Sequence, residues 1–75
     1  MERSPELPFQ RIVNDLSAQI SEGTLLPGEQ LPTVTKLCQT YGVSKVTVLK
    51  ALRTLADEGQ IRIVPRWGTF VADRP

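Results

Sequence analysis

Hydrogen-bond donors and positive charges gather in one short stretch of the chain, between residues 44 and 53. The residues that carry them are Ser44, Lys45, Thr47, Lys50 and Arg53. Ammonium and guanidinium groups only donate, and hydroxyls donate and accept, so this set suits anionic oxygens such as those of phosphate. No Asp or Glu occurs in residues 30–56. The pattern predicts one positively charged face on a chain whose net charge is only +1.

The sequence lacks the combinations of residues that catalysis and metal binding require. There is no His, a single Cys at position 38, and neither a carboxylate cluster nor a phosphate-binding loop. A nucleophile needs a base beside it, and a metal site needs several ligands. We therefore expect no enzyme and no cofactor. We interpret Cys38 as a small buried hydrophobic residue rather than a redox sensor.

The length and composition indicate one small globular domain. Residues 8–72 are expected to form it, with tails at residues 1–7 and 73–75. The hydrophobic fraction, 40%, is ordinary for a globular protein. No stretch approaches the roughly 20 apolar residues that a membrane span needs, and the first residues lack the apolar core of a signal peptide. We expect a cytoplasmic protein that makes no membrane contact.

The first expected element is an amphipathic helix that begins near Pro8 and ends at Gly23. Its apolar residues recur at helical spacing: Phe9, Ile12, Val13, Leu16 and Ile20. Pro is favoured in the first turn of a helix, and Gly is favoured just past its end. The pair Pro27-Gly28 then predicts a type II turn, because Gly tolerates the positive φ of the second central position.

Two more helices are expected on either side of a tight turn at Gly42. Thr33 caps the shorter helix, whose inward residues are Leu37 and Cys38. Ser44 caps the longer helix, which ends near Gly59. The apolar stripe of the longer helix consists of Val48, Ala51, Leu52 and Leu55. Its outward side carries Lys45, Val46, Lys50 and Arg53, with Leu49 at the boundary. Two helices joined by a short turn that contains Gly are typical of a helix-turn-helix.

The last element is a predicted β-hairpin, because the period changes from helical to alternating after Gly59. Ile61 and Ile63 alternate with Arg62, and a second strand at residues 69–71 follows the turn at residues 65–68. We expect Ile61, Ile63 and Phe70 in the core. The predicted fold class is α+β, a winged helix-turn-helix with three helices followed by a two-stranded β-hairpin wing.

Taken in order, the segments of the chain resemble the DNA-binding domain of the GntR family of bacterial regulators, over about residues 8–72. Residues 20–28 are similar to the family's Ile, Gly and Leu-x-Pro-Gly pattern, and Leu31-Pro32-Thr33 is similar to its Leu-Pro-Ser. Residues 41–48, Tyr-Gly-Val-Ser-Lys-Val-Thr-Val, resemble its Leu-Gly-Val-Ser-Arg-x-Thr-Val. Ala51-Leu52-x-x-Leu55, Glu58-Gly59-x-Ile61 and Gly68-Thr69-Phe70-Val71 follow at the family's spacing.

This resemblance implies a sequence-specific regulator of transcription that binds double-stranded DNA. We expect a repressor rather than an activator, because blocking polymerase needs no second surface. The longer helix would enter the major groove, and the wing would reach the neighbouring minor groove or backbone. Lys45 stands where the family has a groove-reading Arg, and Thr33 stands where it has a phosphate-contacting Ser. Ser44 and Thr47 are implied contacts to phosphate or base edges.

The chain departs from the family pattern at several of these positions. Thr35 and Leu49 stand where the family usually has Arg, so Lys36 and Lys50, each one position on, are expected to supply phosphate charge. Val46 with Leu49 offers apolar contact to a thymine methyl. On the wing, Arg66 takes the position of the family's first Gly and suits a narrow minor groove. Trp67 either reaches a sugar or base step or folds back on the hairpin.

The complete predicted DNA interface is Thr33, Thr35, Lys36, Ser44, Lys45, Val46, Thr47, Leu49, Lys50, Arg53, Arg66, Trp67 and Gly68. An alternative is a winged-helix module for protein contacts, because the same fold can lay a helix on another protein. Family members usually carry a C-terminal effector domain that this chain lacks, so it is either a fragment or naturally short. One monomer covers a half-site, and we therefore expect a homodimer on an inverted-repeat operator.

Overall fold

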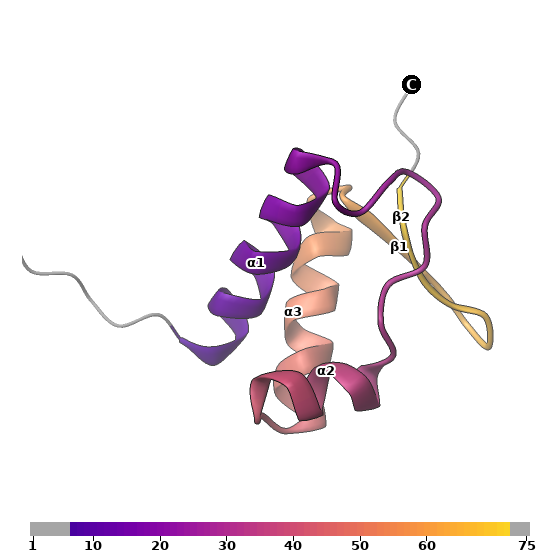
Figure 1. The fold of residues 1–75 in the computed structure, drawn as a ribbon. Coiled ribbons are helices and arrows are strands. Elements are labelled where there is room, and N and C mark those ends of the chain that lie inside the picture. The colour runs from indigo at the N-terminus through magenta and orange to yellow at the C-terminus, as the bar shows by residue number, and fades with distance from the viewer. Residues whose placement is uncertain (1–6, 73–75) are drawn as a thin grey trace, which may run out of the picture.

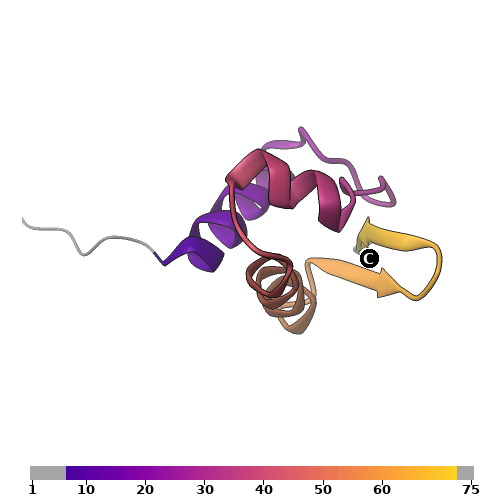
Figure 2. The same cartoon turned by 90° about the horizontal axis from the view of Figure 1, so that it is seen from below.

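The computed structural model describes residues 7–72, shown in Figure 1. Its elements are α1 (Pro8–Glu22), α2 (Val34–Tyr41), α3 (Lys45–Asp57), β1 (Ile61–Val64) and β2 (Gly68–Val71). Helix α3 contacts α1, α2 and β1, and it lies between α1 and the hairpin in both views (Figures 1 and 2). This is the predicted order of three helices and a hairpin. The predicted tails lie outside the described residues, except for Leu7, which is the N-cap residue of α1.

Local sequence sets the helix ends, as predicted. Pro8 is the first residue of α1, and Gly23 ends it in the left-handed region with a φ of 84°. Thr33 caps α2 by accepting a hydrogen bond from the Lys36 N–H at 3.1 Å. Gly42 ends α2 in the same left-handed conformation, and α3 begins only three residues later. The short turn holds α2 against the N-terminal half of α3, as Figure 1 shows.

The core lies where α3 meets its three neighbours. The predicted stripe of α3 is fully buried: Val48, Ala51, Leu52 and Leu55. The other buried residues come from α1, the α1–α2 connector, α2 and the hairpin: Ile12, Leu16, Leu25, Leu31, Leu37, Ile61 and Val71. Val13 and Cys38 are half-buried and pack against this cluster. None of the helices in the described part of the chain has the length and apolar character that crossing a membrane requires.

A third segment of the chain pairs with the hairpin, and the sequence did not indicate this pairing. Its two strands pair antiparallel from Ile61 with Val71 to Val64 with Gly68. The connector between α1 and α2 pairs with the other edge of β2, because the Leu31 N–H donates to the Thr69 carbonyl at 2.8 Å and the Val71 N–H donates to the Glu29 carbonyl at 2.9 Å. The predicted turn at Gly28 precedes this segment, with a φ of 82°. Strand β2 is therefore held on both edges.

The expectation that Ile63 is a core residue is wrong. Ile61 is 2% exposed at the base of the hairpin, whereas Ile63 is 51% exposed. Alternation places both on one face of the strand, but Ile63 lies roughly 6.6 Å nearer the tip and has passed the edge of the helical layer. Phe70, also expected in the core, is only half-buried. The outer half of the hairpin thus projects beyond the core.

Candidate nucleic-acid interface

Two hydroxyls lie together at the N-terminus of α3. Ser44 Oγ accepts a hydrogen bond from the Thr47 N–H at 3.4 Å and lies 3.2 Å from Thr47 Oγ1. This cap satisfies one of the orphan donors of the first turn and leaves others facing outward. The helix dipole makes this end partially positive, so it attracts anions. Lys45 is exposed on the same turn and adds a full positive charge.

The outer face of α3 combines positive charge with exposed apolar side chains. Val46 is 75% exposed and Leu49 is 44% exposed. With Lys50 and Arg53 they line a shallow groove of about 280 Å³. Because residues 30–56 contain no acid, α3 itself places no negative charge on this face before Asp57. The face can therefore receive an anionic partner that also presents apolar groups.

Lys50 is positioned by the first turn of α1. Its ammonium nitrogen lies 4.3 Å from the centre of the Phe9 ring, which is cation–π distance. A second shallow hollow of about 320 Å³ lies beside this contact, and its lining comes from both helices: Leu7, Pro8, Phe9, Val46, Thr47 and Lys50. The sequence indicated Phe9 only as part of the apolar stripe of α1. Its contact with Lys50 extends the α3 face to the start of α1.

The predicted residues of α2 lie at its beginning. Thr33, Thr35 and Lys36 are all exposed, and they belong to the cap and first turn of α2. The Thr33 hydroxyl accepts the Lys36 N–H, so its own hydrogen remains available for donation to another acceptor. These side chains can contact a backbone phosphate without entering a groove.

The tip of the wing, residues 64–68, is a tight turn with an exposed Trp. The Trp67 N–H donates to the Val64 carbonyl at 3.1 Å, and Arg66 has a φ of 75°. Pro65 and Arg66 thus occupy the two central positions of this turn. The second central position ordinarily favours Gly, because its φ is positive. This is the physical reason why the family that the chain resembles has Gly at the position of Arg66. Trp67 is 75% exposed, so it does not fold back on the hairpin. Arg66 is exposed beside it.

The predicted interface residues form separate groups in the folded chain. None is buried, and only Thr47 and Gly68 are half-buried. Val46, Leu49, Lys50 and Arg53 come together in one groove, whereas the hairpin tip projects away from α3 (Figures 1 and 2). Sequence reasoning missed Gln30, whose side-chain nitrogen donates to the Trp67 carbonyl at 3.1 Å. No local pattern could have indicated this contact, because its partners lie 37 residues apart.

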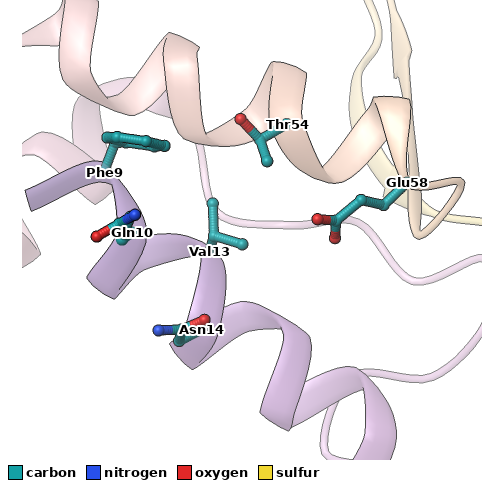
Figure 3. A pocket seen from close by; sticks show the side chains of 6 residues that line it. All are labelled: Phe9, Gln10, Val13, Asn14, Thr54 and Glu58. Carbon is teal, nitrogen blue, oxygen red and sulfur yellow. The ribbon is translucent and has the colours of Figure 1, made fainter. Parts of the chain in front are cut away.

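Another hollow lies between α1 and α3 and shares no lining residue with the groove on the outer face of α3. It measures about 360 Å³, and Figure 3 shows the side chains that line it: Phe9, Gln10, Val13, Asn14, Thr54 and Glu58. Glu58 is its single ionisable group, so the hollow holds no acid–base pair. Within residues 7–72, no three His, Cys, Asp or Glu side chains gather closely enough to hold a metal ion.

Comparison with known proteins identifies the family. The sequence pattern described as "Bacterial regulatory proteins, gntR family" matches residues 8–71. The chain belongs to the gntR family. The Escherichia coli mannosyl-D-glycerate transport/metabolism system repressor MngR is 37% identical to this gntR chain over 65 residues, 87% of the chain and 27% of the repressor. The histidine utilization repressor of Klebsiella aerogenes is 35% identical over 72 residues, 95% of the chain and 30% of the repressor.

Solved structures share the winged-helix fold. AraR(DBD), in complex with operator ORE1, superimposes with a TM-score of 0.91 at 32% identity, over 96% of this gntR chain and 88% of that chain. YtrA from Sulfolobus acidocaldarius, a GntR-family transcription factor, gives a TM-score of 0.86 at 32% identity, over 97% of this chain and 77% of that chain. The predicted fold class is confirmed. The chain spans less than a third of the length of the two curated repressors described above.

Proposed function

We propose that this gntR chain, through residues 8–72, is the DNA-binding unit of a transcriptional repressor. The observation that carries the proposal is the outer face of α3, where Lys45, Lys50 and Arg53 are exposed and no acid occurs from residue 30 to residue 56. Support comes from relatives named as repressors and from the likeness to AraR(DBD), which is bound to an operator. We also propose that the chain has no catalytic role and that it acts in the cytoplasm.

In the proposed complex, α3 enters the major groove, which at about 12 Å is wide enough for a helix. Ser44, Lys45 and Thr47 then contact phosphates or base edges at its N-terminus. Thr33, Thr35 and Lys36 contact the backbone from α2. Arg66, Trp67 and Gly68 reach the adjacent minor groove, where a narrow, electronegative floor attracts a guanidinium.

Two chains on an inverted repeat complete the proposed assembly. One copy of α3 reads only a few base pairs, so a single chain covers a half-site. Binding of two chains to adjacent half-sites raises the affinity without requiring an extensive protein contact. The spacing of the half-sites then reports how the two copies are placed.

The test is a selection of duplexes from a random pool by the chain at near-physiological salt. We expect a recovered motif with two-fold symmetry, and an affinity that falls steeply as salt rises, because each neutralised phosphate changes the slope of log K against log salt by about −0.9. Lys45→Ala is expected to weaken binding about tenfold, within the roughly 1–3 kcal/mol of a good base contact. Arg11→Ala, at an exposed cation of α1, removes the same charge and is the matched control.

Two results would overturn the proposal. The first is an equal loss of affinity in the Lys45 and Arg11 variants, which would mean that binding depends on net charge alone. The second is the absence of any salt-dependent affinity for duplex DNA, and the exposed apolar residues of α3 would then point to a protein partner instead.

A further inference from the structure

Gln30, which lies outside the proposed interface, connects the start of the helix-turn-helix to the tip of the wing. Its side-chain nitrogen donates to the Trp67 carbonyl at 3.1 Å, across 37 residues of sequence. Its backbone lies in the connector that pairs with β2, where it is bridged to Phe70. Gln30 is thus the one side chain of the connector that we find bonded to the turn of the wing within residues 7–72.

The conformation of Gly68 matches this contact. Gly68 has a φ of 124°, which side chains rarely adopt. A Cβ at that position would overlap the Gln30 amide nitrogen and would lie 3.5 Å from Gln30 Cδ and 3.8 Å from its Cγ. The Gln30 side chain therefore occupies the space that a side chain at position 68 would need. Gln30 and Gly68 fit each other, and the hydrogen bond to Trp67 results from that close approach.

The turn between β1 and β2 is stabilised by a hydrogen bond from outside the hairpin. Arg66 adopts a φ of 75°, which is unfavourable for a residue with a Cβ. The Trp67 N–H is bonded to the Val64 carbonyl at 3.1 Å, and the Trp67 carbonyl is bonded to Gln30. Both backbone polar groups of Trp67 are therefore occupied. Together they favour this turn over the alternatives that an Arg would otherwise prefer.

The connector also continues directly into α2. The Leu31 N–H donates to the Thr69 carbonyl at 2.8 Å, and Thr33 caps α2 two residues later. The position of the wing tip and the start of α2 are consequently coupled through a few residues of extended backbone.

We propose that Gln30 is a positioning residue for DNA binding, which holds Arg66 and Trp67 at a set place relative to α2 and α3. The inference rests on the proposed function, because the wing must contact DNA for its placement to affect affinity. Gln30 acts through the backbone of the turn and not by touching DNA. A wing held in place before binding loses less conformational freedom when the complex forms.

The first test uses the free protein and needs no operator. Gln30→Ala removes the side-chain donor, and Gln30→Glu keeps the size but replaces the donor with an acceptor. Gln39→Ala, at an exposed position of α2, is the control. In ¹⁵N relaxation measurements we expect the heteronuclear NOE of residues 66–68 to fall in both Gln30 variants, while α3 and the control stay unchanged. Unchanged values at the tip in Gln30→Ala would overturn the proposal.

The second test is a double-mutant cycle on a duplex recovered by the selection described above. Gln30→Ala is expected to raise Kd about three- to tenfold, the range of one hydrogen bond. In an Arg66→Ala/Trp67→Ala background, the same change should raise Kd less than about twofold, because the wing then has little left to position. Equal losses in both backgrounds would mean that Gln30 contacts DNA directly, and the positioning role would be rejected. Failure of the unmutated chain to bind any selected duplex would instead reject the proposed function, while the relaxation test would still decide whether Gln30 holds the tip.

Discussion

The Tyr41 hydroxyl donates a hydrogen bond of 3.0 Å to Asp15 Oδ2 and thereby ties the last turn of α2 to the middle of α1. Burial raises the pKa of Tyr41 from 10.0 to about 12, with further contributions in the same direction from the hydrogen bond and charge of Asp15, against an opposing contribution from Arg11. The neutral phenol is therefore the form that the folded protein favours. Neither Tyr41 nor Asp15 is one of the predicted interface residues, so this hydrogen bond can be altered without removing an interface residue.

The pH dependence of stability follows from this contact. Because the folded pKa of Tyr41 exceeds its ordinary value, the contribution is fully present below pH 10.0 and is lost as the pH rises through about 12. Tyr41→Phe is expected to lower the free energy of unfolding near neutral pH by about 0.5–1.5 kcal/mol, the net worth of one hydrogen bond. Urea unfolding of both proteins should show the difference between them shrinking over that alkaline window. A difference that stayed constant there would contradict the assignment.

Ser44 allows the capping role to be separated from DNA contact. Ser44→Ala removes the acceptor for the Thr47 N–H and should cost about 1 kcal/mol in thermal or urea unfolding. Ser44→Asp keeps a good N-cap and favours the helix dipole, so stability should be retained. The same Asp places a negative charge beside phosphate, so affinity for the selected duplex should fall by more than in Ser44→Ala. Undiminished binding by Ser44→Asp would exclude this end of α3 from the proposed interface.

Val46 and Leu49 are expected to recognise thymine methyl groups. Both are exposed on the basic side of α3, and thymine is the one base that presents a methyl in the major groove of unmodified DNA. Replacing thymines in the selected half-site one at a time by uracil should raise Kd about fourfold at the contacted positions, from roughly 0.8 kcal/mol per apolar carbon buried. Val46→Ala should weaken that response at one position. If no thymine shows the effect, the two side chains do not read the groove.

The two isoleucines of β1 should respond differently to the same substitution. Ile61→Ala removes a side chain that is 2% exposed and is expected to cost about 2–5 kcal/mol. Ile63→Ala alters a side chain that is 51% exposed and should change stability by no more than about 0.5–1 kcal/mol. Denaturant midpoints at equal m-value provide the comparison. Similar losses at both positions would show that the hairpin packs along its whole length.

The exposure of the predicted interface residues on α3 follows from helical spacing. The charged and apolar residues outside the buried stripe from Val48 to Leu55 are exposed as the sequence predicts, because the stripe leaves them no other side of the helix. Trp67 could not be placed in this way. A residue at a hairpin tip can turn inward or outward, and only the position of the tip beyond the core leaves its side chain 75% exposed.

The sequence by itself determined the helices, their ends and the hairpin, since these depend on contacts within a few residues. Thr33 and Ser44 cap through a bond to the residue three positions on, and Gly42 ends α2 by its own backbone freedom. Only the tertiary structure decided that Ile63 is exposed and that Gln30 reaches Trp67. These facts depend on where the helical layer stops and on which backbone runs beside β2, and neither is encoded in the spacing of neighbouring residues.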